Sequence, residues 1–110
     1  MKKLCLLKKR IKKNEGFSKS VYLDKLGNPT IGYGHLIKYN EKFLLNKKYS
    51  KTSLETLFEK DFTKAVCDFK SHYSLKKMDH RIQEILIEMI FQLGIKNTLK
   101  FKKFNFFLKK

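Results

Sequence analysis

Hydrophobic residues recur at helical spacing near the start of the chain. Leu4, Leu7 and Ile11 form one apolar stripe among lysines, which predicts a short helix over residues 3–13. The Asn-Glu-Gly sequence at 14–16 is expected to end this helix, because Asn and Gly tolerate the left-handed backbone of a helix C-terminus.

A longer amphipathic pattern predicts a second helix over about residues 53–71. Thr52 and Glu55 have the spacing of a capping box, in which each side chain bonds the other residue's backbone amide. The apolar positions on one face are Leu54, Leu57, Phe58, Phe62, Ala65 and Phe69.

The stretch 82–93 is apolar on most sides, which predicts a buried central helix. Asp79 is expected to cap its start and Gly94 to end it. A final helix is predicted from the spacing of Phe101, Phe104, Phe107 and Leu108.

Residues 17–37 have a different character. Val21–Leu23 and 30–33 are rich in strand-forming residues, and the turn-forming stretch 25–29 separates them. This order predicts a small antiparallel hairpin, and with the helices it gives an α+β fold. Residues 38–51 are poorly patterned, with a short helix expected near 41–45.

The charge is concentrated at the two ends of the chain. Of 26 Lys and Arg residues, seven lie in 1–13 and six in 96–110, and neither segment holds an acid, while the formal net charge is +16. Such a field favours a polyanionic partner, which could be nucleic acid, an anionic membrane or a bacterial cell wall. Charge alone does not choose among these, and a merely soluble Lys-rich protein is the plainer alternative.

Targeting and redox signals are weak. The chain lacks the run of about 18 apolar residues that a membrane-spanning helix needs. The apolar run at 4–7 is too short for a secretory signal, so no cleaved signal peptide is expected. Cys5 and Cys67 match no zinc or redox spacing and are expected to be buried or half-buried thiols whose pairing stays open.

Glu15, Asp24 and Thr30 are the candidate catalytic residues. Each alone has an ordinary structural explanation, and for Asp24 it is a turn residue that accepts backbone hydrogen bonds. Together they offer two carboxylates at a helix end and a hairpin edge, with a hydroxyl on the returning strand. Acid-catalysed cleavage of a glycoside needs one protonated and one ionised carboxyl group.

These residues carry a resemblance to a known family. Glu15 is followed after eight residues by Asp24, after five more by Thr30, and then by the sequence Ile-Gly-Tyr-Gly-His. This order resembles the phage-type lysozymes, the T-even phage endolysin family. Similarity extends over about residues 4–108 and is poor over 36–52. Its other elements are Asn14, Gly16, Tyr22-Leu23, Gly27, Pro29, Leu57–Asp61, Ala65-Val66, Ile90–Gly94 and Phe101.

The resemblance implies a role for each matching position. Glu15 would be the general acid, while Asp24 and Thr30 would hold a water on the opposite face of the sugar. The bond cleaved would be the β-1,4 linkage between N-acetylmuramic acid and N-acetylglucosamine of bacterial peptidoglycan, with inversion. Substrate contacts would come from Gly32, Tyr33 and Gln92. His35 and Asp61 would form a structural pair, and no metal or other cofactor is implied.

The resemblance also implies an architecture. A single lysozyme-like domain, 1–110, would hold an N-terminal helix and sheet lobe (1–52), a connecting helix (53–71) and a partial helical lobe (79–110). The family normally continues with several more helices, so a C-terminally truncated form is expected, and an inactive prophage remnant is one alternative. A non-catalytic cationic module that binds envelopes or nucleic acid is another, although no specific nucleic-acid motif is present.

The resemblance places this activity in a bacterial host. Without a signal peptide, the protein would be made in the bacterial cytoplasm. It would reach the anionic cell wall after holin-mediated release or lysis, and cell-wall breakdown would follow.

Overall fold

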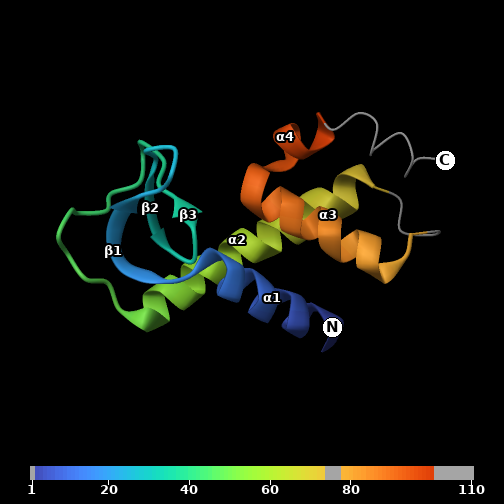
Figure 1. The fold of residues 1–110 in the computed structure, drawn as a ribbon, viewed down its shortest axis with the longest axis horizontal. Helices are drawn as coiled ribbons and strands as arrows, with labels where there is room; N and C mark the ends of the chain where they lie inside the picture. The colour runs from blue at the N-terminus through green and yellow to red at the C-terminus, as the bar shows by residue number, and fades with distance from the viewer. Residues whose placement is uncertain (1, 74–77, 101–110) are drawn as a thin grey trace. The chain divides into compact units, whose positions relative to one another are not determined.

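In a computed structural model that describes residues 2–73 and 78–100, a first helix is followed by short strands and then by further helices (Figure 1). This is the α+β fold expected from the sequence. The chain divides into two compact units, Met1–Asp61 and Phe62–Lys110. The elements in chain order are α1 (Lys2–Glu15), β1 (Ser18–Leu23), β2 (Pro29–Gly32), β3 (His35–Leu36), α2 (Lys51–His72), α3 (His80–Leu93) and α4 (Ile95–Leu99).

Helix α1 confirms the first helical pattern. Leu7 and Ile11 are fully buried, as expected for the apolar stripe. The helix runs through Glu15, so this carboxylate belongs to its last turn. Gly16 ends it with a left-handed backbone, φ 75°, and donates its N–H to the carbonyl of Lys12 at 3.0 Å.

The strands form one antiparallel sheet in the order β1-β2-β3. The expected hairpin is β1 and β2, in which Tyr22 lies opposite Thr30. The sequence did not predict β3, because two residues carry too little pattern to be recognised. Gly32 and Gly34 both have positive φ, which lets the chain reverse within three residues between β2 and β3.

Helix α2 confirms the long amphipathic pattern but begins differently from the prediction. Ser50 caps it, because its Oγ accepts from the N–H of Ser53 at 3.1 Å. The capping box predicted at Thr52 and Glu55 is therefore wrong. The Glu55 carboxylate instead binds Lys12 on α1 and Tyr33 in the β2–β3 turn.

Two ion pairs join α1 to the first half of α2. Lys12 meets Glu55 and Lys8 meets Glu59, each at 2.6 Å. Both lysines and both glutamates are four residues apart, so each pair lies on one helix face. From the first pair to the second, the residue number falls from 12 to 8 on α1 and rises from 55 to 59 on α2. The two stretches therefore run antiparallel.

The short helix expected near 41–45 is wrong. Residues 37–50 form turns and irregular backbone, and the carboxylate of Glu41 accepts from the N–H of Lys38 at 2.8 Å. Leu44 donates its N–H to the hydroxyl of Tyr49 at 2.8 Å. Side chains thus satisfy backbone groups that a helix would otherwise pair.

The second unit contains the other half of α2 with α3 and α4. Asp79 caps α3 by accepting from the N–H of Arg81, and Gly94 ends it with φ 81°, so both predicted caps are confirmed. The prediction that α3 is buried on most sides is only partly right, since Ile85 and Leu93 are 47% and 42% exposed. Among its described residues, the buried side chains are those of Phe62, Ala65, Phe69, Tyr73, Leu86, Ile87, Ile90 and Thr98.

Three other sequence expectations are resolved here. Cys5 and Cys67 are both exposed, so the expected burial is wrong; each lies off its helix's buried face. The final helix predicted over 101–108 lies outside the described residues. None of the helices in the described part of the chain is long and apolar enough to cross a membrane.

His35, on β3, connects the sheet to α2 and to the irregular segment that follows β3. Its Nδ1 lies 2.7 Å from the carboxylate of Asp61 on α2, the partner expected from the sequence. Its Nε2 lies 3.0 Å from Glu41, which the sequence did not indicate. Burial lowers the pKa of His35, but the two carboxylates outweigh burial, so the pKa of His35 is raised overall.

This arrangement predicts a pH-dependent contribution to stability. The folded state holds the His35 proton more tightly than the unfolded chain, whose histidine pKa is about 6.5. The stabilisation is therefore complete below about pH 6 and disappears as pH rises through the raised pKa. Urea unfolding should show His35→Gln less stable than the parent by about 1–3 kcal/mol near pH 6, with a smaller difference at pH 9.

The matched control is His72→Gln, because His72 is exposed on α2 and bonds a backbone carbonyl, that of Asp68. Its stability difference from the parent should be small at both pH values. A His35→Gln difference that stays constant with pH would contradict the charged bridge.

Candidate active site

Glu15 lies where the last turn of α1 meets the turn between β2 and β3. A Cβ built on Gly34 would collide with Oε2 of Glu15, and would lie 3.0 Å from its Cδ and 3.4 Å from its Cβ. Gly34 also has φ 77°, a backbone conformation that L side chains rarely adopt. Glycine at this position therefore allows the turn to pack directly on the carboxyl group.

A polar and aromatic cluster holds this helix end in place. Lys12, one turn before Glu15, binds the carboxylate of Glu55 at 2.6 Å, and the hydroxyl of Tyr33 donates to the same carboxylate at 2.7 Å. The ammonium of Lys12 also lies 5.1 Å from the ring centre of Tyr33 and 4.9 Å from that of Phe58. The cluster thus connects α1, the glycine turn and α2.

The hydrogen bonds of this cluster favour the charged form of Glu55 and the neutral form of Tyr33. The hydrogen bond from Lys12, followed by that from Tyr33, holds the pKa of Glu55 below its ordinary value. Burial, together with the bond to Glu55, raises the pKa of Tyr33 to about 12. Tyr33 therefore stays a neutral donor and Glu55 a charged acceptor at neutral pH.

Asp24 lies in the turn after β1. Its Oδ1 accepts from the N–H groups of Leu26 at 2.9 Å and Asn28 at 2.8 Å. The backbone hydrogen bond from Asn28 is the main cause of a lowered pKa at Asp24. The carboxylate is therefore ionised at neutral pH and, with several lone pairs per carboxylate, keeps capacity for a further donor.

Thr30 lies on β2 and is 2% exposed. Its hydroxyl donates to the carbonyl of Asn28 at 2.9 Å. With its single hydrogen used in this way, the oxygen can only accept from a further group such as a water. Asn28 thus connects Asp24 and Thr30, since its N–H binds one and its carbonyl the other.

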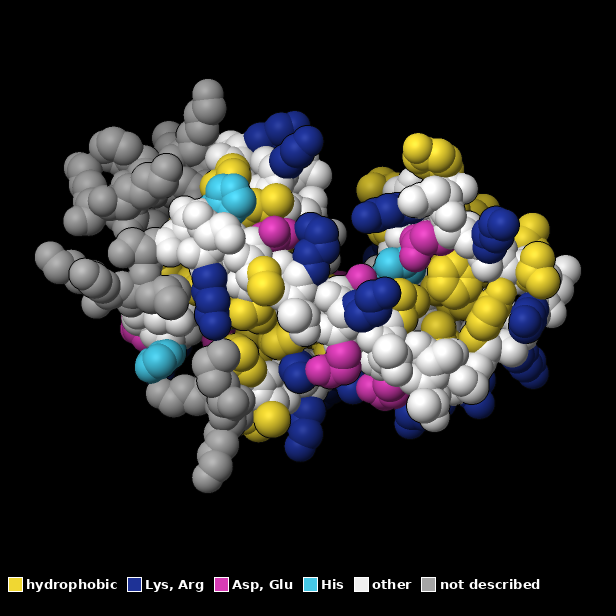
Figure 2. Space-filling model, turned by 180° about the vertical axis from the view of Figure 1, so that it is seen from behind, with side chains coloured by type: hydrophobic (Ala, Val, Ile, Leu, Met, Phe, Trp, Pro, Cys, Tyr) yellow, Lys and Arg dark blue, Asp and Glu magenta, His cyan; other side chains and the backbone are white. Residues whose placement is uncertain are grey.

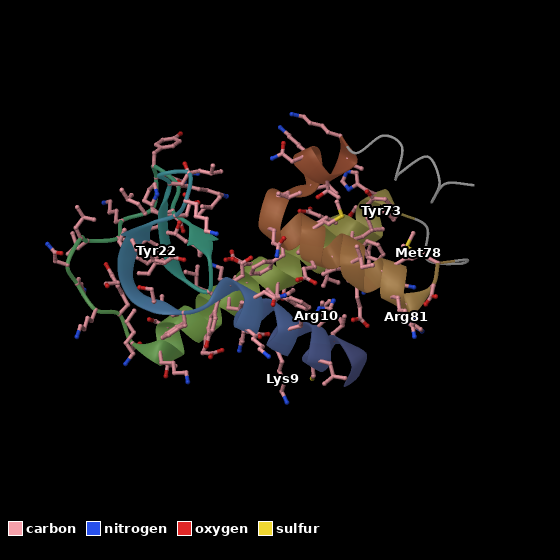
Figure 3. The ribbon with its side chains drawn as sticks, viewed as in Figure 1. Lys9, Arg10, Tyr22, Tyr73, Met78 and Arg81 are labelled. Atoms are coloured by element: carbon pink, nitrogen blue, oxygen red, sulfur yellow. The ribbon has the colours of Figure 1, made fainter. Side chains whose placement is uncertain are left out.

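Tyr22 is a site residue that the sequence placed in the matching motif but for which it indicated no role. It lies on β1 opposite Thr30, is labelled in Figure 3, and is 37% exposed. Burial raises the pKa of Tyr22, and the charges of Glu15 and Asp24 raise it further. One phenol therefore lies within electrostatic reach of both candidate carboxylates. The signals available in the sequence were its place in the matching motif and its position two residues before Asp24.

The three residues expected to contact substrate differ in burial and in the side chains around them. Gly32 is buried, and a Cβ there would lie 3.5 Å from Leu54. The ring centre of Tyr33 lies 4.7 Å from that of Phe17 and 5.4 Å from that of Phe58. Gln92 is exposed on α3, in the second unit. Their assignment to substrate binding stays a prediction, and the contacts of Tyr33 give it a structural role as well.

Among the described residues, no group of three His, Cys, Asp or Glu side chains could hold a metal ion. The carboxyl and hydroxyl groups of Glu15, Asp24 and Thr30 can donate a proton, accept a proton and orient a water.

Comparison with known proteins gives a consistent result. The family model described as phage lysozyme matches residues 12–107. A probable T4-type lysozyme 2 of Dictyostelium discoideum is 35% identical over 120 residues, covering 88% of this chain and 71% of the relative. A probable T4-type lysozyme 1 of the same organism is 31% identical, covering 87% of this chain and 70% of the relative.

A third relative is the pre-baseplate central spike protein Gp5 of Enterobacteria phage T4. It is 31% identical over 83% of this chain, which corresponds to 20% of that larger protein. The segment matched by the family model includes Glu15, Asp24 and Thr30 and most of the remaining chain. On this evidence, the chain belongs to the phage lysozyme family.

Proposed function

We propose that this protein is a muramidase that hydrolyses the β-1,4 bond between N-acetylmuramic acid and N-acetylglucosamine in bacterial peptidoglycan. Membership of the phage lysozyme family makes it a lysozyme in the broad sense. The observation that carries the finer assignment is the grouping around Tyr22: Thr30 lies opposite it, and the charges of Glu15 and Asp24 both act on it.

Glu15 is proposed as the general acid. Glu15 is half-buried at the end of α1, and its carboxyl group packs against Gly34. In this role Oε protonates the glycosidic oxygen as the bond to the anomeric carbon breaks, so that the leaving sugar departs as a neutral alcohol.

Asp24 and Thr30 are proposed to hold the attacking water on the opposite face of the sugar. Asp24 is ionised and can accept a hydrogen bond from one O–H of the water, while the Thr30 oxygen accepts a hydrogen bond from the other. The water then adds to the anomeric carbon as its proton passes to Asp24. An inverting enzyme of this kind needs its two carboxyl groups roughly 6.5–9.5 Å apart, to leave room for the water.

The basic surface is suited to such a substrate. Lysines and arginines are spread over the face seen in Figure 2, and the formal net charge is +16. Cell walls carry anionic polymers, so this charge would raise the local concentration of the enzyme at its substrate. The same charge would make binding sensitive to salt.

Replacement of the proposed acid gives the first test. Glu15→Gln removes the proton donor but keeps the size and hydrogen-bonding ability of the side chain. We expect clearing of a peptidoglycan suspension to slow by about 100-fold or more, because general acid catalysis typically contributes that much. Thermal unfolding of the variant should remain cooperative.

Equal clearing by parent and Glu15→Gln would contradict the assignment. If that lysis also disappeared at high salt, it would favour the alternative of a non-catalytic cationic module.

The packing of Gly34 on Glu15 gives a second test. In Gly34→Ala the new methyl group meets the Glu15 carboxyl, so the acid must move, and displacement by about 1 Å can cost about 100-fold in rate. We expect kcat to fall by about tenfold or more, measured per folded molecule.

The control is Gly94→Ala, because Gly94 has φ 81°, close to the 77° of Gly34, but a Cβ there meets nothing within 4 Å. Both variants should lose stability, because L side chains rarely adopt a backbone with positive φ, so kcat is compared per folded molecule. Similar kcat values for the two variants would show that the contact with Glu15 does not position the acid.

A further inference from the structure

The segment 37–50, between β3 and α2, has a defined shape although it has no regular secondary structure. At its start, Ile37 donates its N–H to the carbonyl of Pro29 at 2.9 Å. At its end, Tyr49 donates its N–H to the carbonyl of Lys19 on β1 at 2.8 Å. Between these points Glu41 binds His35. Figure 1 shows the segment passing along the outside of the sheet before it reaches α2.

Within this segment two aromatic side chains are half-buried, whereas two leucines are exposed. Phe43 and Tyr49 are half-buried, with ring centres 5.3 Å apart in an edge-to-face arrangement. Leu44 and Leu45 are 62% and 74% exposed. Asn46, with φ 64°, reverses the chain directly after them. We name residues 44–48, at this reversal, the tip.

The tip is held in a way that keeps both leucines in solvent. Leu44 donates its N–H to the Tyr49 hydroxyl at 2.8 Å, which closes the reversal across the tip. The ring of Tyr49 also lies under the ammonium of Lys47, at 5.0 Å from its centre. The half-buried rings of Phe43 and Tyr49 thus pack on each other, while Leu44 and Leu45 remain exposed.

Positive charge surrounds the two leucines. Lys42, Lys47 and Lys48 are exposed, and in the described residues no carboxylate forms an ion pair with them. Glu41, the only acid of the segment, is bound by His35 and by the N–H of Lys38. Figure 2 shows hydrophobic and basic side chains next to each other on the sheet-bearing unit.

We propose that the tip, together with Lys42, binds the interface of an anionic phospholipid bilayer, with Leu44 and Leu45 entering the acyl boundary and the three lysines at the headgroups. Adjacent apolar and basic side chains match the two layers of this interface. An anionic polysaccharide would attract the lysines but offer the leucines no apolar phase. The proposal is independent of the proposed function, since it uses none of the catalytic residues.

The test uses the absence of tryptophan from the chain. Leu45→Trp places one fluorophore at the tip and keeps the position apolar. Vesicles of phosphatidylcholine with one third phosphatidylglycerol should shift its emission to shorter wavelength, and brominated lipids should quench it. Vesicles of phosphatidylcholine alone should have little effect.

The matched control is Leu26→Trp, because Leu26 is 86% exposed in the turn between β1 and β2. Its emission should change much less with the same vesicles. In the parent sequence, the double change Leu44→Ser with Leu45→Ser should reduce sedimentation with anionic vesicles by about tenfold or more, at unchanged thermal stability.

Three results would overturn the proposal. They are an equal response from the two tryptophan positions, equal binding to neutral and anionic vesicles, and sedimentation of the double serine variant at the parent level. Binding to isolated cell walls but not to vesicles would assign the basic surface to the polysaccharide instead.

Discussion

The packing of the last turn of α1 on the glycine turn between β2 and β3 is the contact on which the candidate site depends. Glu15 ends the helix, and Gly34 lies so close to its carboxyl group that a methyl group there would displace the carboxyl group. Lys12, Glu55 and Tyr33 hold the same two segments together by charge-assisted hydrogen bonds. The sheet that carries Asp24 and Thr30 is thereby fixed relative to the helix that carries Glu15.

The site places two carboxyl groups in different surroundings. Backbone N–H groups favour the ionised form of Asp24, which suits a base or a group that orients water. Glu15 lies half-buried in the last turn of α1, with its carboxyl group packed against Gly34. Different surroundings of two carboxyl groups are what separate the acid from the base in glycoside hydrolysis.

Local patterns in the sequence predicted local structure well. The stripe of Leu7 and Ile11, the cap at Asp79 and the end at Gly94 were all correct, because each depends on neighbours within a turn or two. The errors involve residues whose partners are distant in sequence. Glu55 has the spacing of a capping box but binds Lys12 and Tyr33, and Glu41, placed in an expected helix, binds His35. For Tyr22, the strand pattern alone does not indicate the two carboxylates that act on it.

The central claim is that Glu15 donates a proton while a water held by Asp24 and Thr30 attacks from the opposite face. The stereochemistry of the product tests this most directly, because the attacking group decides the configuration at the anomeric carbon. Proton NMR of the first product released from soluble peptidoglycan fragments should show the α-anomer appearing first, followed by slow equilibration. Initial release of the β-anomer would mean that configuration is retained, and would contradict the role given to Asp24 and Thr30.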